Sequence, residues 1–221
     1  MNCCSVNGLD RFFNRTRANR ELRAYLKKGP PKRQRVLVDY LKTHNLAGAS
    51  LLEIGCGIGA LHFELLKAGA AKAVGLELAP AYIEAAREVS ERLGLQDAVE
   101  YELLDLAEQG QAVADADIVL LDRVICCYPD MHRLVTAAAQ HARSLVVLTY
   151  PPPVWWMQIG KFFLNTAMVI IKRRFRFFLH DPQKVKHVLS GLAFDRIYNV
   201  RSGICEIGVF QRGSTATRNR H

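Results

Sequence analysis

The sequence lacks the signatures of several protein classes. It opens with Cys3, Cys4 and Asn7 in place of a basic cluster followed by an apolar run, so we expect no secretory signal. Its six cysteines include two adjacent pairs, a spacing that suits neither a disulfide framework nor a Cys-x-x-Cys metal site. No internal repeat is visible. These absences favour a globular protein of the reducing cytoplasm without a bound metal.

The residues that are present fit one α/β domain. Half of the 221 residues are hydrophobic, which is enough for a single large core. The net charge of +9 is uneven, because the chain is basic from Arg11 to Arg35, mainly acidic over 36–153 and basic again from Lys161. Such basic flanks can attract an anion, an acidic lipid surface or nucleic acid, or they can be solvated faces.

Short apolar runs alternate with helix-forming segments along the chain. We expect strands at 50–54, 73–77, 99–103, 117–121, 144–150, 194–201 and 204–211, the last two joined by a turn at Ser202-Gly203. We expect helices at 22–41 with a break at Gly29-Pro30-Pro31, and at 60–68, 80–93, 106–109, 131–141, 154–171 and 181–191. This alternation predicts a doubly wound, Rossmann-like parallel sheet.

A glycine-rich loop, Glu53-Ile54-Gly55-Cys56-Gly57-Ile58-Gly59, follows the first expected strand. Glycines in this position let the backbone turn tightly and approach a ligand at the positive end of the next helix. Gly55, Gly57 and Ala60 also satisfy the looser glycine pattern of dinucleotide-binding folds. The loop alone therefore leaves S-adenosylmethionine and a nicotinamide dinucleotide as alternatives.

Three acidic residues at successive strand ends favour the first cofactor. Glu53 stands where a dinucleotide fold usually has an apolar residue, and its carboxylate can receive the ammonium group of a methionine moiety. Glu77 can accept hydrogen bonds from both ribose hydroxyls, although a nicotinamide enzyme would use it in the same way. Asp105, with Leu106 beside it, can accept the adenine amino group.

At these residues the chain resembles the class I S-adenosylmethionine-dependent methyltransferase family, over roughly residues 50–150. The resemblance implies a seven-stranded sheet with an antiparallel last strand, and S-adenosylmethionine as the cofactor. It implies that the methionine end, the ribose and the adenine are held by Glu53, Gly55, Cys56, Gly57, Gly59, Glu77, Leu78, Asp105 and Leu106. Asp122 follows the fourth strand, where the family often contacts methionine or the acceptor.

The predicted domain covers residues 1–221 and has five parts. These are an N-terminal helical cap (1–45), the S-adenosylmethionine-binding core (46–153), a helical insertion after the fifth strand (154–192), a C-terminal hairpin (193–212) and a disordered tail (213–221). The oligomeric state is not predicted.

Methyl transfer from this cofactor needs mainly positioning of the nucleophile and exclusion of water, so a dedicated base is optional. An ionised carboxylate or thiolate acceptor needs none, whereas a hydroxyl acceptor would need one. Tyr128, after the fourth strand, and His180, beside the cap of a late helix, are the candidate catalytic residues on the acceptor side. Packing or structural hydrogen bonding is the alternative for each.

The segment from Asp122 to Asp130 occupies the position that distinguishes subfamilies by acceptor. It has neither the Asn-Pro-Pro-Tyr tetrad of enzymes that methylate base amino groups nor the Pro-Cys pair of cytosine-carbon enzymes, which disfavours nucleic acid. Its Cys126-Cys127 pair could join Cys3-Cys4 in a thiolate or redox cluster, or could be buried thiols.

Within the family, this segment and the surroundings of His180 most resemble the magnesium-protoporphyrin O-methyltransferase group, which esterifies a porphyrin propionate. The N-terminal region and the tryptophan-rich helix do not match that group. We expect a small acceptor that is apolar or aromatic and carries a carboxylate.

The expected helix at 154–171 is apolar nearly all round, except for a narrow stripe formed by Gln158, Lys161 and Asn165. It is too short and too polar for a membrane span. It could pack as a cap on its own sheet, or residues 154–178 could make a peripheral membrane contact anchored by the basic residues at 172–176.

Overall fold

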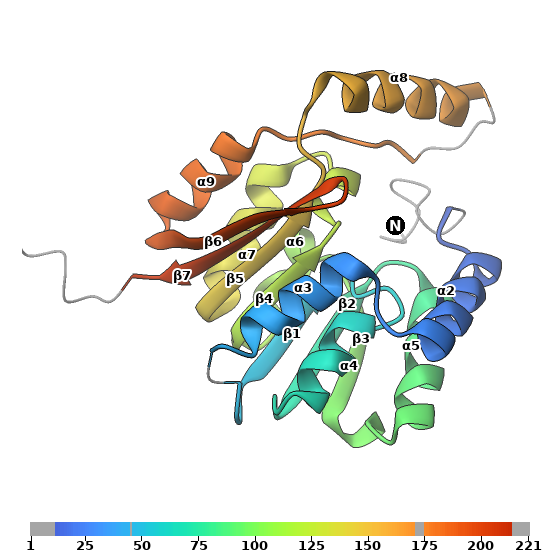
Figure 1. Ribbon diagram of the computed structural model, residues 1–221, viewed down its shortest axis with the longest axis vertical. Coiled ribbons are helices and arrows are strands. Elements are labelled where there is room, and N and C mark those ends of the chain that lie inside the picture. The colour runs from blue at the N-terminus through green and yellow to red at the C-terminus, as the bar shows by residue number, and fades with distance from the viewer. Residues whose placement is uncertain (1–11, 45, 171–174, 214–221) are drawn as a thin grey trace, which may run out of the picture.

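The computed structural model describes residues 12–44, 46–170 and 175–213 (Figure 1). Seven strands form one sheet: β1 (Ser50–Ile54), β2 (Lys72–Glu77), β3 (Val99–Leu103), β4 (Ala116–Asp122), β5 (Ala142–Tyr150), β6 (Phe194–Ser202) and β7 (Cys205–Arg212). Their order is β3-β2-β1-β4-β5-β7-β6. Strands β1 to β5 pair in parallel, and β7 is antiparallel to both β5 and β6. The predicted doubly wound sheet with an antiparallel last strand is confirmed.

Helices cover both faces of the sheet. The described helices are α2 (Arg15–Lys28), α3 (Lys32–Leu41), α4 (Ala60–Lys67), α5 (Pro80–Leu93), α6 (Leu106–Gln109), α7 (Met131–His141), α8 (Trp155–Ile170) and α9 (Pro182–Gly191), of which α8 belongs to neither face. Single turns of 3₁₀ helix lie at η2 (Gln96–Ala98), η3 (Gly110–Ala112) and η4 (Ile125–Cys127).

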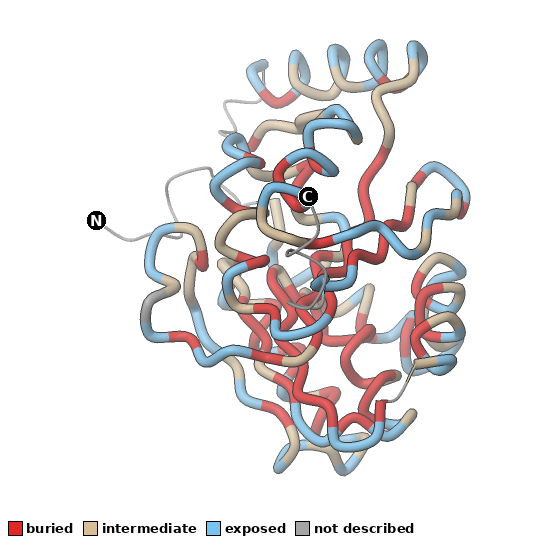
Figure 2. The backbone as a smooth tube through the Cα atoms, turned by 90° about the vertical axis from the view of Figure 1, so that its left-hand side faces the viewer, coloured by how far each residue is buried: buried red, intermediate tan, exposed pale blue. Residues whose placement is uncertain are grey.

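Two hydrophobic cores lie on opposite faces of the sheet, because successive strand residues point to opposite sides. Leu51 of β1 and Leu120 of β4 belong to the core under α2 to α5, whereas their neighbours Leu52 and Leu121 belong to the core under α6, α7 and α9. The buried backbone therefore runs through the middle of the molecule in Figure 2. This double covering explains why the strands appear in the sequence as continuous apolar runs.

The N-terminal helices differ from the prediction in one respect. Helix α2 begins at Arg15 instead of residue 22, because the Asn14 side chain accepts a hydrogen bond from the Arg17 N–H (3.1 Å) and caps the helix there. Only Ala18, Leu22 and Tyr25 of α2 are buried, so its first turn carries little apolar signal. The predicted break is confirmed, since α3 begins at Lys32.

Helix α8 follows β5 at the carboxyl edge of the sheet and stands apart from the other helices (Figure 1). Among the described residues, no helix combines the length and apolarity that crossing a bilayer requires. Cys3, Cys4, residues 172–174 and residues 214–221 lie outside the described residues, so the predicted cysteine cluster and the predicted tail beyond Gly213 stay predictions. Gly213, the first residue of the predicted tail, donates its N–H to the Ala193 carbonyl oxygen (2.7 Å). The five-part division of the chain also stays a prediction.

Candidate functional site

The predicted ligand-binding residues meet at one edge of the sheet, at β1. Strand β1 lies between β2 and β4, so the strand order reverses there. Open parallel sheets bind ligands at the carboxyl ends of their strands, at such a reversal point. Glu53, Glu77 and Asp122 lie at or next to the carboxyl ends of β1, β2 and β4, and Asp105 closely follows β3.

The loop at residues 55–59 has a backbone that requires glycine. Gly55, Gly57 and Gly59 have φ values of 62°, 58° and 83°, in the left-handed region. A Cβ on Gly59 would lie 2.6 Å from Nε2 of His62, and one on Gly55 would lie 2.8 Å from Cγ2 of Val124. Gly59 also caps α4, which brings the positive end of that helix to the loop. The backbone here can approach an anionic group closely.

Glu53 is buried next to this loop and pairs with His62 of α4. Their side chains are 2% and 0% exposed, and Nδ1 of His62 lies 2.6 Å from Oε2 of Glu53. The His62 backbone N–H donates to the same oxygen at 3.3 Å. Burial raises the pKa of Glu53, and the contacts with His62 offset only part of that rise. In the described part of the chain, Oε1 of Glu53 has no hydrogen-bond partner.

Glu77 braces the glycine loop from the end of β2. Its Oε2 accepts a hydrogen bond from the Gly57 N–H at 2.9 Å, and its Oε1 accepts from the N–H groups of Leu78 (2.8 Å) and Ala79 (3.0 Å). Burial raises the pKa of Glu77, although the three N–H groups act against that rise. A carboxylate offers about four acceptor positions, so capacity for a further donor remains.

Asp105, Tyr128 and His180 form one connected group. Asp105 caps α6 by accepting from the Ala107 N–H (3.0 Å), and the Tyr128 hydroxyl lies 3.2 Å from both of its carboxylate oxygens. Nε2 of His180 lies 3.1 Å from the Tyr128 carbonyl oxygen. The two predicted catalytic residues thus lie in contact with each other, and Tyr128 also contacts Asp105, the residue predicted to bind adenine. Burial and the nearby Asp105 raise the pKa of Tyr128, which keeps its phenol protonated near neutral pH.

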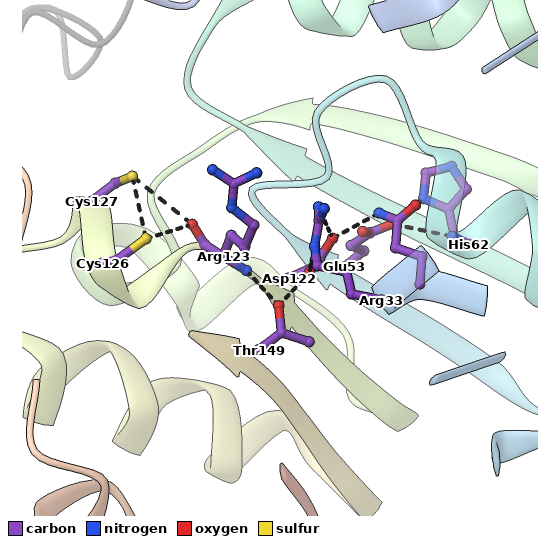
Figure 3. A network of polar contacts seen from close by, with 9 residues as sticks. Arg33, Glu53, His62, Asp122, Arg123, Cys126, Cys127 and Thr149 are labelled. Atoms are coloured by element: carbon purple, nitrogen blue, oxygen red, sulfur yellow. Dashed lines mark hydrogen bonds and ion pairs between the residues drawn. The ribbon is translucent and has the colours of Figure 1, made fainter. Parts of the chain in front are cut away.

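Asp122 binds the N-terminal helix α3 (Figure 3). Its side chain, 5% exposed, accepts Nε–H and Nη2–H of Arg33 at 3.0 and 2.8 Å, and the amide of Gln34 at 2.7 Å. The Thr149 hydroxyl also donates to it. Burial alone would raise the pKa of Asp122, but the hydrogen bonds and charge of Arg33, with those of Thr149 and Gln34, hold it below its usual range. These four donors fill the capacity of a carboxylate.

Arg123 has a left-handed backbone, with φ of 62°, although it is not glycine. Non-glycine residues held in this region cost free energy and cluster at functional sites. Its N–H donates to the Thr149 carbonyl oxygen (2.9 Å), and its own carbonyl accepts from the Cys126 thiol (3.2 Å). The Arg123 side chain is exposed and points away from the network in Figure 3. In the described part of the chain, it has no ion-pair partner.

The side chains of two predicted cofactor-binding residues point into the protein interior. The Cys56 thiol is buried against Gly75 and lies 3.6 Å from the Gly57 carbonyl oxygen, while the Cys56 N–H donates to the Leu76 carbonyl oxygen (3.0 Å). Burial raises the pKa of Cys56 well above its usual value. Leu106, 3% exposed, belongs to the core under α6 and α7. Their predicted cofactor contacts stay predictions, and Leu78 is half-buried beside Glu77.

Sequence reasoning missed His62, Arg33, Gln34 and Thr149. His62 is the one polar residue in the first turn of α4 (60–63), which is a usable signal for a buried partner. Arg33 and Gln34 lie in a basic, polar stretch that gives no such signal. Thr149 follows a run of apolar residues in β5, where the usual expectation for a threonine is packing.

The model of a methyltransferase domain family matches residues 52–145 of this chain. Ribosomal protein L11 methyltransferase from Escherichia coli is 36% identical over 83 residues, which is 38% of this chain and 27% of that protein. The Aeromonas hydrophila protein of the same name is 39% identical over the same share. The chain thus matches about a quarter of the length of these curated relatives.

Solved structures match almost the whole chain at low identity. Magnesium protoporphyrin IX methyltransferase from Synechocystis PCC 6803, solved with bound S-adenosylhomocysteine, has a TM-score of 0.73 at 19% identity, covering 93% of this chain and 98% of that one. An O-methyltransferase family protein from Burkholderia thailandensis has a TM-score of 0.71 at 15% identity, covering 96% and 64%. These similarities show the fold.

Proposed function

We propose that this chain, which has the class I methyltransferase fold and a methyltransferase domain, binds S-adenosylmethionine at the ends of β1, β2 and β3 and methylates a small acceptor. One observation carries the proposal. Glu53, Glu77 and Asp105 lie at the ends of three adjacent strands, around a loop of left-handed glycines. The three carboxylates match the ammonium, ribose and adenine donors of this cofactor.

The residues of the site fit the cofactor on structural grounds. Oε1 of the buried Glu53 lacks a partner among the described residues, so it can accept an ammonium group. A bound ammonium would also offset the burial that raises the pKa of Glu53. Glu77 has capacity for a ribose hydroxyl while it holds the loop through Gly57. When bound, S-adenosylmethionine supplies a methyl group on a positively charged sulfur.

Glu53 also separates this proposal from a nicotinamide-dependent oxidoreductase. A dinucleotide presents phosphates to the glycine loop, and a buried carboxylate next to the loop would repel them. We expect calorimetry to detect S-adenosylhomocysteine binding to the purified chain and no binding of NADH. Binding of NADH without any binding of S-adenosylhomocysteine would reverse the assignment.

The acceptor is proposed to be small, apolar or aromatic, and to carry an acidic group. Arg123 supports this part, because its exposed guanidinium follows β4 next to Asp122 and has no acidic partner among the described residues. A carboxylate acceptor is already ionised, so it needs no base. Tyr128 is a protonated phenol bonded to Asp105, and its carbonyl oxygen contacts His180, which favours a positioning role for it between the cofactor and acceptor halves.

Transfer of labelled methyl groups tests the acceptor class. The purified chain is incubated with methyl-labelled S-adenosylmethionine and separate fractions of small organic acids, RNA and protein. We expect label in the organic-acid fraction and its loss in Arg123→Gln. Label only in RNA or only in protein would overturn the acceptor proposal and leave the cofactor assignment standing.

The cytoplasmic location is part of the same proposal. Cys56, Cys126, Cys127 and Cys205 are all free thiols, and the Sγ atoms of the adjacent pair lie 3.8 Å apart without a bond. Free thiols persist in reducing compartments.

A further inference from the structure

Helix α8 turns an apolar face to solvent. Trp155, Phe162, Phe163 and Ile170 are between 65% and 74% exposed. Together with the other exposed apolar side chains of α8 they form what we name the outward face: Trp155, Trp156, Ile159, Phe162, Phe163, Val169 and Ile170. Several of these residues recur at spacings of three and four, which places them on one side of a helix.

The inward side of α8 is the more polar one. Met157 and Met168 are its buried residues, and Lys161 lies between them in the sequence on the same side. Asn165 ties α8 to the chain that follows, because its amide accepts from the Phe177 N–H (2.8 Å) and donates to the Phe177 carbonyl oxygen (2.9 Å). The helix is thus held in place with its apolar face outward. Monomeric proteins seldom expose such a contiguous apolar patch unless it binds something.

Charge identifies the kind of partner. The sequence from Trp155 to Phe178 contains basic residues and no acidic ones. In a symmetric dimer the same basic segments would face each other and repel. An anionic lipid surface instead attracts basic side chains while apolar and aromatic side chains enter the boundary of its acyl chains. We propose that the outward face of α8 docks on an anionic membrane surface, with the helix lying in the plane of the interface.

This docking would give the candidate site a defined orientation. Helix α8 follows β5 from the carboxyl edge of the sheet, which is the edge that carries Glu53 and Glu77 (Figure 1). A docked molecule would therefore hold this edge on the membrane side, within reach of an apolar acceptor dissolved in the lipid. The proposal itself does not depend on the methyltransferase assignment, because it concerns lipid binding alone.

Both tryptophans of the chain lie on the outward face, so their fluorescence reports on α8 directly. The full chain is titrated with vesicles of equal parts phosphatidylcholine and phosphatidylglycerol, and with vesicles of phosphatidylcholine alone. We expect a blue shift and co-sedimentation with the anionic vesicles, weaker binding at high salt, and little binding to the neutral vesicles. No blue shift and no co-sedimentation at low salt would overturn the proposal.

Variants localise the contact. The double variant Phe162→Ser/Phe163→Ser should lower the vesicle partition coefficient by about tenfold or more, since two large apolar contacts are lost. The control Ile197→Ser removes a side chain that is 40% exposed inside β6, away from the carboxyl edge, and should leave partitioning unchanged. Unchanged binding of the double variant would overturn docking through α8. Self-association without vesicle binding, abolished by the double variant, would instead assign the face to a second copy of the chain.

Discussion

Two regions of the candidate site differ in how far apart in the sequence their contacting residues lie. In the cofactor half, at the ends of β1 to β3, Glu53 contacts a residue 9 positions away and Glu77 contacts one 20 positions away. In the acceptor half, at the ends of β4 and β5, Asp122 contacts Arg33 across 89 positions, and His180 contacts Tyr128 across 52. The cofactor half lies within residues 53–105, on three successive strand ends, whereas the acceptor half depends on segments from both ends of the domain.

The difference suggests a division of roles. A local loop can be carried unchanged between proteins, which agrees with a family match confined to residues 52–145. The segments that complete the acceptor half, α3, α8 and the chain at 175–181, lie outside that match. The proposed acceptor half therefore depends on segments that the family match does not cover.

The largest expected effect is on stability, in the acceptor half. Asp122→Ala would leave the Arg33 guanidinium without its buried partner, so we expect a loss of about 3–5 kcal/mol in the free energy of unfolding. Urea unfolding measures this loss. The double variant Asp122→Leu/Arg33→Met should recover part of it, because both charges are then removed while the Gln34 amide and the Thr149 hydroxyl still lose their acceptor. A loss below about 1 kcal/mol in Asp122→Ala would show that the pair does not hold α3 to the sheet.

The same sequence separations explain which parts of these regions could be predicted from the sequence. The boundaries of β1, β3, α5 and α7 agree with the prediction because each carries its own apolar period and its own stop signals. The position of Glu53, Glu77 and the glycines at the carboxyl edge of the sheet could be predicted because they stand next to strand ends in the sequence. The pairing of Asp122 with Arg33 could not, since no local pattern links a polar helix to a strand end 89 residues later.

The second prediction concerns the cofactor half. Glu53→Gln keeps the shape of the side chain but removes the charge that would receive an ammonium group, so S-adenosylhomocysteine affinity should fall tenfold to a hundredfold, which is about 1.5–3 kcal/mol. Calorimetry measures the affinity. Glu102→Gln, an exposed carboxylate on β3, is the matched control and should bind like the wild type. Equal affinity in Glu53→Gln would remove Glu53 from the cofactor site.

The third prediction concerns pH. The folded-state pKa of Asp122 lies below its unfolded value, so the stability it contributes is full above the unfolded pKa of about 3.9 and is lost as pH falls through the folded pKa. The gap in unfolding free energy between wild type and Asp122→Asn should therefore narrow as the pH drops below about 4. Urea unfolding over a pH series checks this, with Asp39→Asn, an exposed carboxylate, as control. A gap that stays constant would contradict the ion pair.

The smallest effect concerns Arg123. Arg123→Gly relieves a left-handed backbone, which should raise the free energy of unfolding by about 1 kcal/mol, while removal of the guanidinium lowers methyl transfer to an acidic acceptor. Thermal unfolding and labelled transfer measure the two effects. A stability gain without any loss of transfer would place Arg123 outside the acceptor site.

The independence of the two halves is tested most directly by calorimetry with S-adenosylhomocysteine on a pair of variants. Glu77→Gln removes the charge of a side chain that braces the glycine loop and is proposed to bind the ribose of the cofactor. The affinity of this variant for S-adenosylhomocysteine should therefore fall at least tenfold. Arg123→Gln, which lies beyond β4, should stay within about threefold of the wild type. Wild-type affinity in Glu77→Gln, or an equal loss in both variants, would contradict a cofactor site confined to the ends of β1, β2 and β3.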